Sequence, residues 1–141
     1  MYSPGTINSR RVIVNGTFDI LHRGHLEMLK FAKSQGSYLL VAIDSDRLVR
    51  ELKGDSRPIN NQEDRKFALE SLKCVDAVWI FDSQSELAHI CQIFRPDLMV
   101  KGSDYRGKTI TGSEYCNYIK FYPLVQNYST SGIIENINNR K

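Results

Sequence analysis

The chain has 141 residues, of which 41% are hydrophobic and 25% charged, and its formal net charge is +3. This length is enough for one globular domain with its own hydrophobic core, and the composition is that of an ordinary soluble protein. Lys and Arg are spread along the chain, whereas nucleic-acid binders concentrate them into a basic stripe. We therefore expect local phosphate-binding sites and no nucleic-acid partner.

The cysteines and the N-terminus indicate a compartment. Cys74, Cys91 and Cys116 form no CxxC pair, which argues against a disulfide framework or a zinc site, and reduced thiols are typical of the cytoplasm. The N-terminus lacks the apolar core of a signal peptide, and no apolar run approaches a membrane span. We expect a cytoplasmic protein without a membrane partner, folded as one domain over residues 1–141 with a flexible extension at residues 1–9.

Apolar runs of strand length alternate with longer helical patterns. A strand at 11–15 precedes a helix at 24–33, and a second strand at 38–43 is apolar throughout, as in strands buried on both faces of a parallel sheet. The later elements are expected at 44–52 (helix), 62–72 (helix), 77–81 (strand), 86–94 (helix), 97–100 (strand), 120–125 (strand) and 132–137 (helix).

This order predicts an α/β fold, a doubly wound and mostly parallel sheet of the Rossmann-like type with right-handed crossovers. In such a sheet, ligands bind at the carboxyl ends of the strands, at the point where the strand order reverses. The loops that follow the strands are therefore where functional residues are expected.

The most informative segment is NGTFDILHRGH, from Asn15 to His25, between the first strand and the first helix. Gly16 permits a tight turn and a close approach to a ligand. The amides and positive dipole end of the helix form an anion site. His22 and His25 are three residues apart, so both imidazoles can face one pocket. The alternative is that the pair only caps or packs.

These residues resemble the cytidylyltransferase-like nucleotidyltransferases, whose signature is a strand, G-T/C-F-D and then H-x-G-H. Further segments match in order: LKGDSRPI, EDR, VKGSDY and STSGII. KGDSRP, VKGSDY and the following GSE most resemble the heptose 1-phosphate adenylyltransferases. The glycerol-3-phosphate cytidylyltransferases are the next most similar branch. They carry RTEGISTT. This chain has Leu124 in place of the arginine of that motif, and its Ser131-Gly132 also departs from the pattern.

The resemblance implies a nucleotidyltransferase that moves NMP from an NTP, expected to be ATP, to a sugar phosphate such as a heptose 1-phosphate, and releases pyrophosphate. The alternative is a CTP-dependent transfer to glycerol 3-phosphate or another polyol or amino-alcohol phosphate. A catalytically silent nucleotide-binding module is a third interpretation. Mg²⁺ is expected to arrive with the NTP, with no dedicated protein site. A homodimer is expected from the resemblance alone.

Position and resemblance together assign roles to individual residues. The catalytic residues are His22, His25, Lys53 and Arg65. The nucleotide-binding residues are Gly16, Thr17, Phe18, Asp19, Gly24, Asp104, Ser129, Thr130 and Ser131. The acceptor-binding residues are Asp46, Arg57 and Lys101. Several of these have structural alternatives: core packing for Phe18, holding a loop for Asp19, helix capping for Asp46, Ser129 and Thr130, a solvated basic loop for Lys53 and Arg57, and an ordinary surface position for Arg65.

Overall fold

Five parallel strands form one open sheet in the order β3-β2-β1-β4-β5. A computed structural model of the protein describes residues 9–123 and 129–140. The strands are β1 (Arg11–Gly16), β2 (Tyr38–Asp44), β3 (Ala77–Phe81), β4 (Leu98–Gly102) and β5 (Tyr118–Tyr122). The predicted doubly wound α/β fold is confirmed, and every strand pair that the structure describes is parallel.

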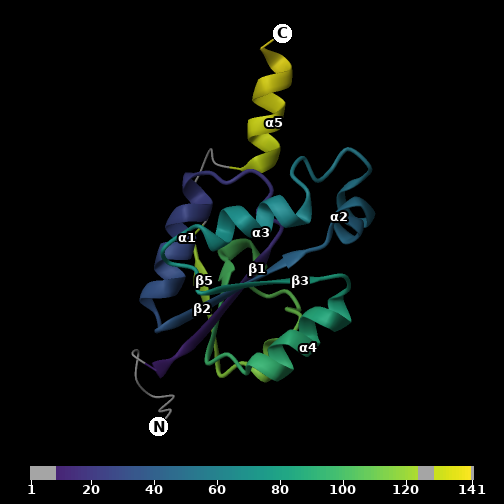
Figure 1. The fold of residues 1–141 in the computed structure, drawn as a ribbon. Helices are drawn as coiled ribbons and strands as arrows, with labels where there is room; N and C mark the ends of the chain where they lie inside the picture. Colours follow the sequence, from purple (N-terminus) through teal and green to yellow (C-terminus); the bar gives the residue numbers. More distant parts are fainter. Residues whose placement is uncertain (1–8, 124–128, 141) are drawn as a thin grey trace.

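Helices cover both faces of the sheet (Figure 1). The helices are α1 (Arg23–Ser34), α2 (Asp46–Lys53), α3 (Gln62–Glu70), α4 (Gln84–Phe94) and α5 (Thr130–Asn139). The side chains of α1 and α3 pack in the core on one face, and those of α2 and α4 in the core on the other. Figure 1 shows α5 standing away from the sheet.

The alternation of side chains explains why the central strands are apolar throughout. In β2, Leu39 and Val41 lie in the core with α1 and α3, whereas Leu40 and Ala42 lie in the core with α2 and α4. All four are fully buried. A strand covered by helices on both faces has no position for an exposed polar side chain.

Element boundaries differ from the prediction by up to two residues along the chain; for example, α2 begins at Asp46 rather than residue 44, and α4 begins at Gln84 rather than residue 86. β5 begins at Tyr118 rather than residue 120. Helix α5 begins at Thr130, two residues early, because the Ser129 side chain caps it by accepting from the Gly132 backbone N–H. Residues 1–8 of the predicted extension at 1–9, Leu124 and the expected end of the fifth strand lie outside the described residues.

The strand order reverses between β1 and β4. The chain runs outward from β1 through β2 to β3 and then returns to place β4 on the other side of β1. At such a switch point the loops after two neighbouring strands leave in opposite directions and open a crevice. No helix among the described residues is long and apolar enough to cross a membrane.

Candidate active site

His22 and His25 cap helix α1 reciprocally. His22 is the N-cap residue, and its Nδ1 accepts the backbone N–H of His25 at 3.4 Å. The His25 Nδ1 accepts the backbone N–H of His22 at 3.3 Å. The two rings stack with centroids 3.7 Å apart. This is a capping box built from two imidazoles, and it satisfies helix donors that would otherwise lack partners.

This geometry selects the protonation state of both rings. An Nδ1 that accepts a backbone N–H carries no proton, so each neutral imidazole is a donor at Nε2. Burial lowers the pKa of His22. Burial, assisted by the charges of His22 and Lys53, lowers the pKa of His25 from 6.5 to about 4. The site therefore offers two neutral N–H donors near neutral pH.

Phe18 packs against His25. Its ring lies 5.0 Å from the His25 ring, and its side chain is buried in the core. Phe18 has φ of 51°, a left-handed backbone conformation that a non-glycine residue rarely adopts. A Cβ on Gly16 would lie 3.0 Å from the Phe18 ring. The tight turn therefore falls at Phe18, and Gly16 is required for the close approach of that ring.

Two cavities meet at His25. The first, called the switch-point cavity, has a volume of about 600 Å³ and lies over the ends of β1 and β4. The second, called the helix-end cavity, has a volume of about 580 Å³ and lies over the N-termini of α1 and α5. Five residues line both cavities: Thr17, Phe18, His25, Met28 and Lys53. A ligand in one cavity would therefore contact a ligand in the other beside His25 and Lys53.

The helix-end cavity collects donors from three segments of the chain. It is lined by His22 and Gly24 at the start of α1, by Arg57, and by the three hydroxyl residues at the start of α5, Ser129, Thr130 and Ser131. The Arg57 Nη1 donates to Ser131 Oγ at 3.4 Å, whereas its buried Nε and Nη2 have no hydrogen-bond partner among the described residues. Two helix N-termini and a guanidinium favour a polyanion.

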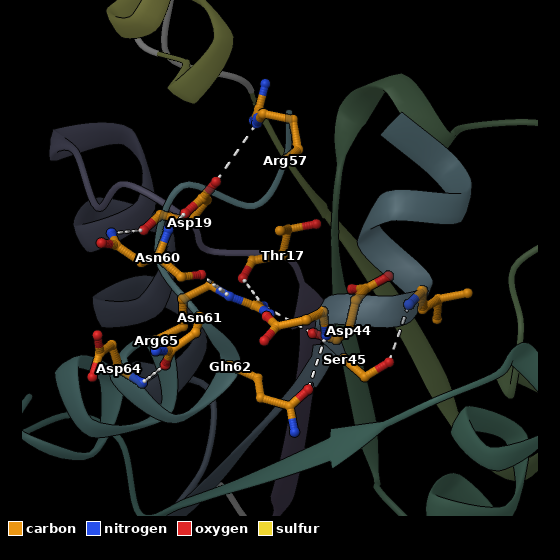
Figure 2. Close-up of polar contacts among 12 residues, drawn as sticks. Thr17, Asp19, Asp44, Ser45, Arg57, Asn60, Asn61, Gln62, Asp64 and Arg65 are labelled. Carbon is orange, nitrogen blue, oxygen red and sulfur yellow. Dashed lines mark hydrogen bonds and ion pairs between the residues drawn. The ribbon is translucent and has the colours of Figure 1, made fainter. Parts of the chain in front are cut away.

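Asp19 holds the loop that carries Arg57. Its buried carboxylate accepts the backbone N–H groups of Ile59 at 2.7 Å and Asn60 at 2.8 Å, and Arg57 Nε lies 3.6 Å from it (Figure 2). The Asn60 side chain donates back to the Asp19 backbone oxygen at 2.8 Å. Both carboxylate oxygens are therefore occupied within the protein, which favours the loop-holding alternative for Asp19.

Arg65 and Asp46 are the two predicted site residues that line neither cavity. Arg65 is buried, and Figure 2 shows its guanidinium reaching between the ends of neighbouring segments. It donates to the backbone oxygens of Asn60, Thr17 and Asp44 and to Asp46 Oδ1, at 2.8–3.0 Å. Protein acceptors thus take up four of the Arg65 donors, and the expectation that Arg65 faces the ligand stays a prediction. Asp46 pairs with Arg65, and the helix cap is Ser45 instead.

The switch-point cavity contains charged residues at the end of β4, just after it, and at the end of α2. Lys101, on β4, donates from Nζ to Asn15 Oδ1 at 3.1 Å and lies 4.0 Å from the centroid of the Tyr105 ring. Burial lowers the pKa of Lys101. Burial also lowers the pKa of Lys53, and the charge of Arg57 lowers it further. Asp104 lines the same cavity.

Sequence reasoning missed Asp44, the last residue of β2, which lines this cavity and is 8% exposed. The sequence pattern predicts it at the start of a helix. The available signal is its position, because a polar residue that ends an apolar strand of a parallel sheet lies at the ligand-binding edge. Gln84, Thr109 and Thr111, which also line the cavity, carry no such signal.

A family profile described as Cytidylyltransferase-like matches residues 13–136. The chain belongs to the cytidylyltransferase-like family. It is a nucleotidyltransferase of this family. The matched residues include His25 and Lys53, which line both cavities.

Similar proteins support this assignment. The chain is 47% identical over 126 residues to the Bifunctional protein HldE of Helicobacter pylori (strain Shi470), and the match covers 89% of this chain and 27% of that protein. The same figures hold for the Bifunctional protein HldE of Campylobacter fetus subsp. fetus (strain 82-40). The chain thus spans little more than a quarter of the length of these relatives.

Solved structures share the fold. The lipopolysaccharide core biosynthesis protein from Thermoplasma volcanium GSS1 superposes with a TM-score of 0.64 at 25% identity, covering 85% of this chain and 98% of that chain. Pantothenate synthetase from Thermus thermophilus superposes with a TM-score of 0.60 at 14% identity, covering 84% of this chain and 57% of that chain. The second likeness concerns the fold alone.

Proposed function

We propose that this nucleotidyltransferase transfers an adenylyl group from ATP to a sugar phosphate such as a heptose 1-phosphate and releases pyrophosphate. The observation that carries the proposal is the pair of cavities that share His25 and Lys53. A transfer between two substrates requires two adjoining sites with catalytic donors at their junction.

The helix-end cavity is the proposed site of the nucleotide. This proposal moves Arg57 from the expected acceptor site to the nucleotide site, and it places Gly16 and Asp104, expected to bind the nucleotide, in the other cavity. The α1 and α5 N-termini supply backbone amides, and Arg57 has two buried nitrogen atoms without hydrogen-bond partners among the described residues. The β- and γ-phosphates of ATP carry the charge that such donors bind. The α-phosphate is then expected beside His25, at the boundary with the other cavity.

The switch-point cavity is the proposed site of the acceptor. Lys53 and Lys101 line it and provide positive charge for the acceptor phosphate. An acceptor phosphate oxygen attacks the α-phosphorus, the bond to the bridging oxygen of pyrophosphate breaks, and pyrophosphate leaves with the electron pair. The Nε2–H groups of His22 and His25 stabilise negative charge on the phosphoryl oxygens.

Mg²⁺ is proposed to enter with the nucleotide. Among residues 9–123 and 129–140, no three His, Cys, Asp or Glu side chains converge as a metal site. The Asp19 carboxylate is occupied by backbone N–H groups. The phosphate oxygens of the nucleotide and water are the ligands that Mg²⁺ prefers.

The choice of ATP and of a heptose phosphate rests on sequence similarity. KGDSRP and VKGSDY resemble the adenylyltransferase branch, and one similar structure is described as a lipopolysaccharide core biosynthesis protein. The alternative remains CTP with glycerol 3-phosphate.

A substrate panel tests the proposal. The full chain is incubated with Mg²⁺, either ATP or CTP, and either heptose 1-phosphate or glycerol 3-phosphate. Pyrophosphate and the nucleotide-linked product are then measured. We expect turnover with ATP and heptose 1-phosphate. Turnover with CTP alone would contradict the adenylyl assignment, and no pyrophosphate from any pair would contradict the proposed function itself.

A further inference from the structure

Asp44 is a buried carboxylate without a structural task. It ends β2 and is 8% exposed, and its backbone oxygen accepts from Arg65 Nη1 at 2.8 Å. Its carboxylate takes part in none of the contacts drawn in Figure 2. Among the described residues, it forms no ion pair within 4.0 Å and accepts no side-chain hydrogen bond.

Asp97 is a buried carboxylate with the opposite surroundings. It is 2% exposed and lies just before β4, at the opposite edge of the sheet. Its carboxylate accepts the Arg11 backbone N–H at 2.8 Å and the Asn117 side-chain amide at 3.3 Å. Asp97 therefore joins strands, as a buried carboxylate normally does. Asp44 is also buried, but it lacks such partners, and it lines the switch-point cavity.

The energetics of Asp44 also indicate a ligand. Burial raises the pKa of its carboxyl, although the N–H of its own backbone and the charges of Lys53, Arg65 and Lys101 oppose this change. Removal from water is unfavourable for a carboxylate unless hydrogen bonds replace the lost solvation. A ligand that supplies those hydrogen bonds would satisfy the group.

The surrounding charges restrict the chemistry of that ligand. A phosphate next to the carboxylate would be repelled, and a metal ion or an amine would face the three nearby cations. An ionised carboxylate only accepts hydrogen bonds, so it requires neutral donors. Hydroxyl groups meet these conditions, and a sugar phosphate brings them together with an anion that the two lysines of the cavity can bind.

We infer that Asp44 is a specificity-determining residue that accepts hydrogen bonds from hydroxyl groups of the acceptor in the switch-point cavity. This inference rests on the proposed function, and it goes further by naming how the acceptor's sugar is distinguished from a simple phosphate. The side chain would contact the acceptor away from the reacting phosphate.

The test compares Asp44→Asn with the wild type and with a matched control, Asp97→Asn. Steady-state kinetics are measured with heptose 1-phosphate and with deoxy analogues of it, at saturating Mg-ATP. In Asp44→Asn, we expect kcat/KM for heptose 1-phosphate to fall about 10- to 100-fold, with the KM for ATP unchanged. The variant should also discriminate less between heptose 1-phosphate and its deoxy analogues.

Thermal unfolding separates this role from a structural one. Asp44→Asn should unfold at the wild-type temperature or above it, because the substitution removes a buried charge. Asp97→Asn should unfold about 3–10 °C lower, because it disturbs a satisfied carboxylate, while its KM for the acceptor stays the same. A lowered unfolding temperature in Asp44→Asn, or an equal loss toward ATP, would assign Asp44 to the structure and overturn the inference.

Two further outcomes separate the inference from the proposed function. If the wild type turns over and Asp44→Asn matches it with every acceptor, the inference fails and the function stands. If the wild type releases no pyrophosphate, the function fails, and calorimetric binding of heptose 1-phosphate decides the inference. Weaker binding to Asp44→Asn would support it, whereas equal or absent binding to both proteins would overturn it.

Discussion

His22 and His25 each accept the other's backbone N–H, so the two imidazoles hold one another in place at the start of α1. The residues that begin the helix thus also line the site: His25 lies at the junction of the two cavities, and His22 lines the helix-end cavity. Because both ring orientation and protonation follow from the same pair of hydrogen bonds, the Nε2–H donors are set before a substrate binds.

His22→Asn should separate helix capping from catalysis. Asparagine is a favourable N-cap residue, so its side-chain oxygen can accept the His25 N–H in place of Nδ1. It lacks the Nε2–H donor. We expect the free energy of unfolding to change by less than about 0.5 kcal/mol, while kcat falls on the order of 10²–10³-fold.

His22→Ala is the matched control for this comparison. It removes both the cap and the donor, so it should lose the same activity and about 1 kcal/mol of stability as well. Denaturant unfolding and pyrophosphate release provide the two measurements. Wild-type turnover in His22→Asn would show that the histidine acts only as a cap.

The folded protein should bind a proton at His25 only in acid. Burial places its pKa at about 4, below the value of 6.5 expected for the unfolded chain. Between these values the unfolded state binds the proton more readily, so stability should fall as the pH decreases from 6.5 towards 4. Above pH 6.5 this group should have no effect on stability. NMR titration of the imidazole carbons measures the midpoint directly, and a midpoint near 6.5 would contradict the buried, capping geometry.

Arg65→Ala should destabilise the fold strongly. The substitution leaves three backbone oxygens and the carboxylate of Asp46 without their donor. Loss of one partner from a buried charged network typically costs about 3–5 kcal/mol. Urea unfolding is the measurement. Arg47→Ala is the control, because Arg47 pairs with Asp82 and Glu51 at the surface and its loss should change the unfolding midpoint little.

The same experiment separates a structural role of Arg65 from the predicted catalytic one. If Arg65 contacted the phosphates, Arg65→Lys would retain stability and lose turnover. One ammonium group cannot reach acceptors in three segments of the chain. We therefore expect Arg65→Lys to lower the free energy of unfolding.

Arg57→Lys should weaken nucleotide binding without loosening the fold. Two of the Arg57 nitrogen atoms are buried beside the helix-end cavity without a hydrogen-bond partner among the described residues. Lysine retains the charge but not the planar fork that matches phosphate oxygens. We expect the KM for ATP to rise about tenfold, with the unfolding temperature unchanged. If the KM for the acceptor rose instead, the helix-end cavity would be the acceptor site, and the proposed assignment of the two cavities would be wrong.

The sheet could be predicted from the sequence because its signals are local. The apolar run of β2 and the alternation of strands with helices identify a parallel sheet, and the sheet places the loops after β1 and β4 at the ligand edge. The position of the histidines after β1 then follows. Their reciprocal capping does not, because histidine is not a usual N-cap residue.

The roles of Arg65, Asp46 and Asp44 depend on contacts between distant segments. Arg65 donates to residues 48 and 21 positions earlier in the chain, and no local pattern encodes such contacts. In the sequence EDR, the arginine has the appearance of an exposed residue at the start of a helix. The role of Asp44 is not evident from the sequence for a different reason. Its neighbours Ser45 and Asp46 make the segment look like the start of a helix.

The stereochemical course at the α-phosphorus tests the central claim, that the acceptor attacks the nucleotide directly across the shared wall of two cavities. The wild-type protein is given one diastereomer of ATP carrying sulfur at the α-phosphate, together with heptose 1-phosphate, and the product is analysed by ³¹P NMR. Direct in-line displacement predicts inversion of configuration at phosphorus. Retention would mean two successive displacements through a covalent nucleotidyl-enzyme, and it would contradict direct transfer between the two cavities.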